Sequence, residues 1–472
     1  MSLNALTPEA DAVRDARRPG VVHLGLGAFH RSHQAWFTQR IAPDRDPWGI
    51  IAFTGRRPDA ATALAEQNCV YTVIERSADG DTASLIDAVI EAHDGADALR
   101  WREAVSDDRV AVITLTVTEA AYLRTRDGVV DLHTSAVASD VARLREGAAD
   151  ACTTVPGRLV DGLRARRDTG SGPVAVLCCD NLTDNGAVVR GVVTSLASAV
   201  DDELAAWITD NVSFVSSMVD RITPATTDDD RATALTLTGY DDHAVVVAEP
   251  FAEWVVSGAF PAGRPAWETA GVRFVDDLEP YEQRKLWLLN AGHSLLAYLG
   301  LLFGHETVDE AMADPRCAEP LEALWDEAAA VLPLPAAEIG DACASLRDRF
   351  RNPRIRHRLR QIAADGSVKL PVRVVDPVRL HLAAGEPIGD GAATALAAWW
   401  LHLTEQPSLV NDEGATALGA SCSVDDVLRV LAPDLAGRPT LGAAVSAAAD
   451  RVLDLLSPST MNTAIAPTGA TA

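Results

Sequence analysis

Two lysines stand out in this sequence because arginine supplies nearly every other positive charge. Of the 41 lysine and arginine residues, only Lys285 and Lys369 are lysines. Arginine stays protonated in proteins, whereas a desolvated lysine can lose its proton and act as a base. Chance survival of two surface lysines would explain the count equally well, so the neighbouring residues must decide between the two interpretations.

The residues around Lys285 form a polar cluster on an otherwise apolar segment. Pro280 suits the first turn of a helix and Gly304 suits its end, so we predict a helix between them. At 100° per residue, an arc of about 140° on this helix holds Glu282, Lys285, Asn290 and His293. Desolvation disfavours the charged form of a lysine, and a neutral lysine can take the proton of a hydroxyl while hydride leaves the carbon. The cluster therefore predicts alcohol oxidation, with Lys285 transferring the proton.

A glycine-rich segment near the start of the chain is typical of a dinucleotide-binding turn. The apolar run 21–24 stops at the sequence Gly-Leu-Gly-Ala-Phe-His. A strand, a tight turn and a helix whose N-terminus binds a pyrophosphate would satisfy this order. A histidine replaces the third glycine of the usual fingerprint. We expect cofactor contacts from Gly25, Gly27, Ala28, Phe29 and His30, and from Thr116 after a later strand.

Strand-like and helix-like runs alternate along the first half of the chain. Apolar runs at 49–53, 110–116, 173–179 and 244–248 are separated by helix-compatible segments at 58–66, 140–146 and 188–200. This alternation predicts an α/β fold: a Rossmann-type, doubly wound sheet domain over residues 1–276. A mainly helical substrate-binding and catalytic domain would follow over 277–472. We expect the active site in the cleft between the two domains, at the carboxyl ends of the strands.

The choice between NAD and NADP depends on the residues after the second strand. They are Thr54, Gly55, Arg56 and Arg57, with no acidic residue to bind the ribose of NAD. The two arginines could hold the 2′-phosphate of NADP, or they could be solvated loop charges. We take NAD as the cofactor and keep NADP as the alternative.

Composition limits the partners and the compartment. A formal charge of −26 argues against nucleic acid and anionic membranes as partners. The longest strongly apolar stretch, 295–303, is too short to span a bilayer, and residues 1–18 lack an apolar signal core, so we predict a cytoplasmic protein. The seven cysteines show no CxxC spacing, and no ligand-spaced cluster is evident. We predict neither disulfides nor a metal site.

Six segments together resemble the polyol-specific long-chain dehydrogenase family, also known as the mannitol dehydrogenase family. They are residues 25–34, 179–181, 217–224, 249–251, 285–293 and 365–371. The resemblance runs from about residue 21 to about residue 382. It implies a metal-independent NAD(P)-dependent dehydrogenase that acts on a small polyol or sugar acid, as a monomer or a weak homo-oligomer.

The resemblance also implies roles for single residues. Lys285 would be the general acid/base, and Asn181 and Asn290 would donate hydrogen bonds to the substrate oxygen, on which charge develops. The other implied roles are substrate orientation by His293, a proton relay through Glu282, a position near the nicotinamide for Asp220, and substrate binding by Lys369.

The segments 356–363 and 373–382 are more similar to the fructuronate reductase branch of the family than to its mannitol branch. A cluster of Arg356, Arg358, Lys369 and Arg373 could bind the carboxylate of a sugar acid, although at least half of these arginines are expected on a helix surface. We therefore predict interconversion of D-mannonate and D-fructuronate. Oxidation of mannitol or arabinitol is the alternative, and a nucleotide-sensing protein without catalysis is a remote one.

Overall fold

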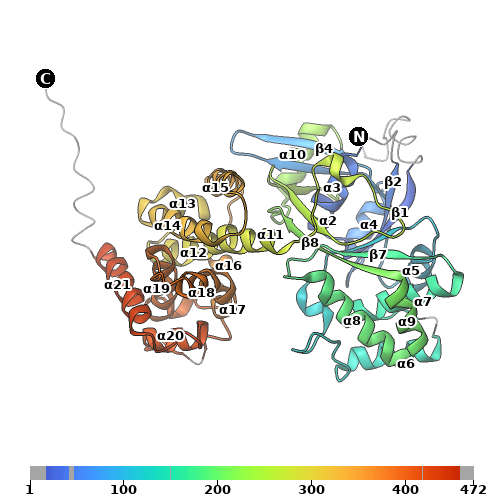
Figure 1. Ribbon diagram of the computed structural model, residues 1–472. Helices are drawn as coiled ribbons and strands as arrows, with labels where there is room; N and C mark the ends of the chain where they lie inside the picture. Colours follow the sequence, from blue (N-terminus) through green and yellow to red (C-terminus); the bar gives the residue numbers. More distant parts are fainter. Residues whose placement is uncertain (1–16, 42–46, 149, 417, 458–472) are drawn as a thin grey trace. The chain divides into compact units, whose positions relative to one another are not determined.

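Buried apolar runs of the first half of the chain assemble into an eight-stranded sheet (Figure 1). The computed structural model describes residues 17–41, 47–148, 150–416 and 418–457, so most of the segment 1–18 lies outside the described residues. The strand order is β11-β10-β8-β7-β6-β1-β2-β5. The strands are β1 (Arg18–Leu24), β2 (Trp48–Phe53), β5 (Val89–His93), β6 (Val112–Leu115), β7 (Val174–Cys178), β8 (Val212–Asp220), β10 (Glu253–Ser257) and β11 (Arg273–Phe274).

All pairs from β5 to β8 across this sheet are parallel, and β10 runs antiparallel to β8. Successive side chains of β1 enter different cores, as the two-residue period of a strand requires. Val22 and Leu24 pack with helices α5 (Ala98–Val105), α6 (Ser135–Glu146), α7 (Val155–Thr169), α8 (Asn185–Val200) and α9 (Asp202–Asn211). Val21 packs on the other side, with α3 (Gln34–Gln39) and α4 (Asp59–Ala65). The predicted Rossmann-type sheet with helical layers is confirmed.

A small second sheet corrects one strand assignment. The run 244–248 does form a strand, β9 (Val246–Ala248), but β9 does not join the large sheet. It pairs in parallel with β3 (Tyr71–Arg76), which also pairs with β4 (Asp81–Ile86). Helix α10 (Asp228–Thr238) packs on this sheet. The sequence pattern showed a buried strand, but it carried no information about the strand's partner.

The second compact unit begins at Pro280 and contains only helices among its described residues. Its core is one large apolar cluster built around α12 (Ala291–Leu302), α14 (Pro315–Val331) and α19 (Asp390–Glu405). The remaining helices are α13 (Val308–Ala313), α15 (Ala336–Phe350), α16 (Leu359–Ile362), α17 (Gly366–Leu370), α18 (Asp376–Ala383), α20 (Val424–Leu431) and α21 (Pro439–Leu456). Among the described residues, no helix combines the length and apolar character needed to cross a membrane.

The predicted helix between Pro280 and Gly304 exists, but it is not a regular α-helix. It consists of α11 (Glu279–Arg284), the π-helical segment η4 (Lys285–Asn290) and α12, with no break between them. A second π-helical segment, η5 (Pro371–Val375), lies between α17 and α18 and contacts η4. Single π turns inside α-helices are rare and are frequent at functional sites.

Candidate active site

The glycine turn after β1 has the geometry that a dinucleotide-binding loop needs. Gly25 adopts a φ of 110°, and a Cβ atom built on it would lie 2.1 Å from the carbonyl oxygen of Thr116. Gly27 precedes α2 (Ala28–Ser32) with an extended backbone and no side-chain cap. Main chain therefore lies open at the start of α2, where a phosphate group can accept hydrogen bonds from N–H groups. The loop fits a dinucleotide.

A buried histidine holds the glycine turn through Thr116. The Thr116 hydroxyl donates to the carbonyl oxygen of Gly25 at 2.9 Å, so its single proton is used there. It must then accept the Nε2–H of His23, at 3.0 Å, which leaves Nδ1 of His23 to accept from the Thr114 hydroxyl at 2.9 Å. Burial lowers the pKa of His23 to about 3, in keeping with this neutral tautomer.

His30 was predicted among the cofactor-contacting residues, but its side chain is fully buried. Its ring stacks on the ring of His23, with centroids 3.3 Å apart and an interplanar angle of 11°. Burial holds the pKa of His30 well below its usual range, so two neutral rings lie against each other. In this arrangement His30 supports the turn from inside the unit, whereas Gly25, Gly27, Ala28 and Phe29 are partly exposed.

The loops after β6 and β7 are joined by a buried carboxylate that sequence reasoning did not single out. One oxygen of Asp180 accepts from the N–H of Val117 at 2.5 Å, and the other accepts from the hydroxyl of Tyr122. Asp180 is 6% exposed, and burial raises its pKa. Asp180 lies two residues after the end of β7, so it fixes the loop that carries the exposed Asn181 next to the loop that carries Thr116.

Arg221 joins three of the segments that carry the family resemblance. Its guanidinium donates to the carbonyl oxygens of Ser32 at 2.5 Å and Glu249 at 3.0 Å, and to the carboxylate of Glu75 at 2.7 Å. The Arg221 side chain is fully buried. It follows Asp220, the last residue of β8, which is 9% exposed. Through Arg221, these segments therefore hold the carboxyl end of β8 in place.

In the second unit, the π turn changes the expected arrangement of the polar cluster. Residues five apart on an α-helix are about 140° apart around the axis. In a π turn the backbone hydrogen bond links residues five apart, so Lys285 and Asn290 lie one above the other. The predicted arc was calculated for a regular helix and is wrong in this segment. The π turn places the two residues on one face more closely than the prediction did.

Side chains from neighbouring helices donate to the main chain of η4. The indole of Trp325 donates to the carbonyl oxygen of Leu288 at 2.9 Å. Nη1 of Arg373 donates to the carbonyl oxygen of Asn290 at 3.2 Å and to the hydroxyl of Ser294 at 3.0 Å. Trp325 and Arg373 thus hold the turn that carries Lys285 and Asn290, and the hydroxyl of Ser294 holds Arg373 in place.

Burial lowers the pKa of two positively charged groups of this region, Arg373 and Lys369. Burial lowers the pKa of Arg373 to about 10, and no ion pair with a carboxylate is found for it among the described residues. Lys369 donates to the carbonyl oxygens of Ala364 at 2.6 Å and Ile362 at 3.4 Å. Its pKa is lowered by burial and, secondarily, by the charge of Arg373. Both groups would gain from a nearby anion.

His293 lies in α12 and is 7% exposed. Its pKa is held well below the usual range by burial, and the charges of Arg349 and Arg373 act in the same direction. The ring of His357 meets it edge to face at 4.9 Å. His293 is therefore a neutral hydrogen-bonding group, as orientation of a hydroxylated substrate requires.

Several of the predicted binding residues lie on the surface. Arg56 and Arg57 are exposed, and Arg57 lies 3.7 Å from Asp59. Arg356 and Arg358 are exposed as well, and Arg356 has a left-handed φ of 49°. The structure thus separates the half-buried Arg373 from exposed arginines that the sequence could not distinguish from it.

One group of potential metal ligands occurs among the described residues, outside this region. It consists of His305, Asp314 and Cys317, whose ligand atoms lie within 4.8 Å of one another. Asp314 is already paired with Arg316 at 2.6 Å and with His305 at 2.8 Å. Burial raises the pKa of Cys317 to about 12, which keeps the thiol protonated. These contacts describe an ion-pair cluster, and the predicted absence of a metal site stays a prediction.

Comparison with known proteins agrees with this architecture. Residues 19–269 match the mannitol dehydrogenase Rossmann domain, and residues 277–418 match the mannitol dehydrogenase C-terminal domain. The chain is 41% identical to the uncharacterized oxidoreductase YdfI of Escherichia coli K12, over 82% of this chain and 79% of that protein. It is 38% identical to D-mannonate oxidoreductase of the same organism, over 82% of this chain and 80% of that protein.

A solved structure extends the similarity to the whole fold. Mannitol 2-dehydrogenase of Pseudomonas fluorescens, in a ternary complex with NAD and D-mannitol, superimposes with a TM-score of 0.75. It is 32% identical, and the match covers 98% of this chain and 95% of that one. The fold and the glycine turn define the class of nucleotide-dependent oxidoreductases. Within that class, the chain belongs to the mannitol dehydrogenase family, and the predicted resemblance is confirmed.

The glycine turn gives a first prediction. Gly25→Ala should weaken NADH binding at least about tenfold, because an L-residue with positive φ is strained and its Cβ would displace Thr116. Fluorescence titration with NADH measures the change. Gly340→Ala in α15 is the matched control, since nothing lies within 4 Å of a Cβ there. Equal affinity for NADH in the Gly25 variant and wild type would contradict the role given to the turn.

His23 gives a second prediction. Its pKa is about 3 in the folded chain and about 6.5 when unfolded, so the unfolded state binds more protons between these values. Stability should therefore be lost as the pH falls below about 6.5, with His23 contributing about 1.4 kcal/mol per pH unit. Urea unfolding at pH 7 and pH 5 measures the slope. In His23→Asn the slope of the unfolding free energy against pH should be shallower by the contribution of about one bound proton. An unchanged slope would show that His23 is not the responsible group.

Proposed function

We propose that this protein catalyses reversible hydride transfer between the secondary alcohol of an open-chain sugar acid and its ketone, D-mannonate and D-fructuronate. NAD serves as the hydride acceptor in the direction of oxidation, and no metal ion takes part. The family membership supports the reaction type, and the second unit supports the choice of an acidic substrate.

The proposal of an acidic substrate rests mainly on Arg373. Arg373 is half-buried, and a partly desolvated guanidinium without a carboxylate partner is stabilised by a ligand that supplies negative charge. Within the described part of the chain, Arg373 donates hydrogen bonds only from Nη1, to Asn290 and Ser294. The Nε and Nη2 edge of the guanidinium can therefore meet a carboxylate with two parallel hydrogen bonds. Lys369, one turn earlier along the chain, adds a second positive charge.

The residues of the π turn supply the proton chemistry. In the oxidation, neutral Lys285 accepts the hydroxyl proton of the substrate as the carbon–oxygen double bond forms, and Glu282 passes that proton to solvent. Asn290 and Asn181 donate hydrogen bonds to the substrate oxygen and stabilise the charge that develops on it. His293 remains neutral and binds a substrate hydroxyl, because burial opposes its protonation.

Residues of the first unit would hold the cofactor. The turn at Gly25 and Gly27 brings main chain within reach of a pyrophosphate, and Thr116 keeps that turn in shape. Asp220 at the end of β8 would lie near the nicotinamide. When bound, NAD accepts the hydride that leaves the substrate carbon. We propose NAD in preference to NADP, because Arg56 and Arg57 lie exposed after β2 and Arg57 is close to Asp59.

The role of Lys285 can be tested directly. Lys285→Ala should lower kcat by roughly 10²–10⁴-fold, the usual contribution of a positioned acid/base, and should leave NADH affinity nearly unchanged. Lys285→Arg should be almost as inactive, because arginine does not release its proton. Steady-state rates and NADH titration measure the two effects. Turnover close to wild type in either variant would exclude Lys285 as the proton acceptor.

The choice of substrate is tested by comparing an acid with a neutral polyol. Wild-type protein should oxidise D-mannonate with a higher kcat/KM than D-mannitol, measured as NADH formation at 340 nm. Arg373→Gln should lower kcat/KM for D-mannonate roughly 100-fold, because the charge-assisted hydrogen bonds are lost. The rate with D-mannitol should fall much less, because that substrate loses only the donor from Arg373 to the π turn and no carboxylate contact.

Arg360→Gln is the matched control, because Arg360 is exposed in α16 and close in sequence to Lys369. Equal losses with both substrates in Arg373→Gln would mean that Arg373 acts only as a donor to the π turn. Preference of the wild-type protein for D-mannitol would replace the sugar-acid proposal with oxidation of a neutral polyol.

A further inference from the structure

The two π-helical segments of the second unit hold each other through a reciprocal pair of hydrogen bonds. Trp287 of η4 donates its indole N–H to the carbonyl oxygen of Val372 in η5, at 3.2 Å. Arg373 of η5 donates in the opposite direction, to the carbonyl oxygen of Asn290 in η4, at 3.2 Å. Each turn thus receives a side-chain donor from the other. We call this pair of bonds the π clasp.

Arg373 is also proposed to bind the substrate, whereas Trp287 has no proposed role other than its hydrogen bond to Val372. Trp287 is 4% exposed, so its N–H would lack a partner without Val372. A buried N–H that loses its hydrogen-bond partner is left without water to replace it, which destabilises that arrangement. A π turn is also rare compared with an α turn. It therefore depends on contacts outside its own helix.

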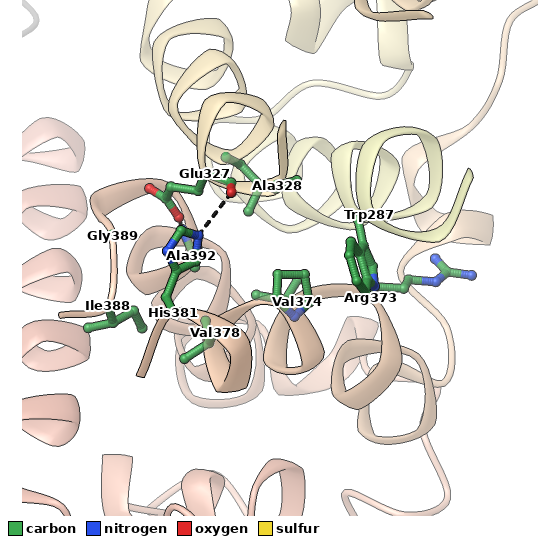
Figure 2. A pocket seen from close by; sticks show the side chains of 12 residues that line it. Trp287, Glu327, Ala328, Arg373, Val374, Val378, His381, Ile388, Gly389 and Ala392 are labelled. Carbon is green, nitrogen blue, oxygen red and sulfur yellow. Dashed lines mark hydrogen bonds between the residues drawn. The ribbon is translucent and has the colours of Figure 1, made fainter. Parts of the chain in front are cut away.

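A pocket lies beside the clasp. Trp287 and Arg373 line one end of it, and it extends to His381 and Glu327 (Figure 2). In Figure 2 the guanidinium of Arg373 points away from this pocket. The indole of Trp287 packs in the apolar core of the second unit, and its hydrogen bond to Val372 fixes the orientation of the ring within that packing.

We infer that Trp287 is a positioning residue, which keeps η4 in its π form and so keeps Lys285 aligned with Asn290. This inference rests on the proposed function, since it concerns the alignment of the proposed acid/base. If η4 relaxed to an α turn, Lys285 and Asn290 would move to about 140° apart around the helix axis. The same bond fixes η5, and with it the distance between Lys285 and the segment that carries Lys369.

Trp287→Phe tests the inference, because phenylalanine keeps an aromatic ring and removes the N–H. Trp400→Phe is the matched control: Trp400 also donates its indole N–H to a carbonyl oxygen, that of Cys422 at 2.8 Å, elsewhere in the second unit. We expect Trp287→Phe to lower kcat about tenfold and to leave NADH affinity unchanged. The inflection of the pH profile of kcat should also move upward, because a loosened turn admits water to Lys285. Trp400→Phe should show neither change.

A second measurement needs no substrate. The sequence has only two lysines, so acetic anhydride labelling over a pH series, followed by mass spectrometry of the peptides, reports on Lys285 by itself. We expect the midpoint for Lys285 to rise by about one pH unit in Trp287→Phe and to stay at the wild-type value in Trp400→Phe. An unchanged midpoint together with an unchanged pH profile would overturn the positioning role, even if thermal stability fell.

The two measurements separate the failure of this inference from failure of the proposed function. If the wild-type protein oxidised neither D-mannonate nor D-mannitol, the proposed function would fail, and the labelling result would still decide whether Trp287 controls the surroundings of Lys285. If wild-type turnover were as proposed and Trp287→Phe behaved like Trp400→Phe in both measurements, the clasp alone would be rejected.

Discussion

The conformation of six residues, Lys285–Asn290, determines how the chemistry of the second unit is arranged. A π turn repeats its backbone hydrogen bond at five residues, whereas an α turn repeats it at four. The lysine and the asparagine are five residues apart, so the π form brings them to the same face and the α form would separate them. Helix α14 and the second π-helical segment, η5, pack against this turn, which explains how an uncommon backbone form can be held in one place.

In the first unit, the glycine turn must also be held in shape by residues outside it. The turn must leave main-chain N–H groups open, so it cannot use its own side chains to hold its shape. The hydroxyl groups of Thr114 and Thr116 and the neutral, buried ring of His23 provide that support from behind the turn. The stacked ring of His30 fills the space beside His23. In both units, the segments expected to meet ligand are held in place by hydrogen bonds from side chains behind them.

The fold was largely predictable from sequence, because it depends on periodic patterns. The strands β1, β2, β6 and β7 were found as apolar runs, and the helical second unit was recognised from the change in pattern near residue 277. The pairing of β9 with β3 was not predictable, since a strand pattern does not identify its partner. The π turn was missed for a similar reason: hydrophobic residues at 286–289 fit an α-helix as well, and the deviation becomes visible only in the hydrogen bonds.

In the candidate site, too, some residues were predictable from the sequence and others were not. The chemically distinctive residues, Lys285, Asn290 and His293, were identified from their types and spacing, and their catalytic roles remain proposals. The residues that hold them were not identified, because Trp287 and Ser294 look like ordinary members of an apolar helix. The rarity of lysine in this chain was a useful signal for the first group. A tryptophan inside a run of leucines gave no comparable signal for the second.

Charge explains why the arginines of the second unit could not be ranked from sequence. The chain has a formal charge of −26, so an isolated surface arginine meets a favourable field and needs no ligand. That argument fits the exposed Arg356 and Arg358. It does not fit Arg373, which is half-buried and whose partners are an uncharged carbonyl and a hydroxyl. A partly desolvated cation paired only with neutral groups is stabilised by an anion that arrives from outside, and a sugar carboxylate is such an anion. The same residue also holds the π turn, so binding of the acid and alignment of the lysine would depend on one guanidinium.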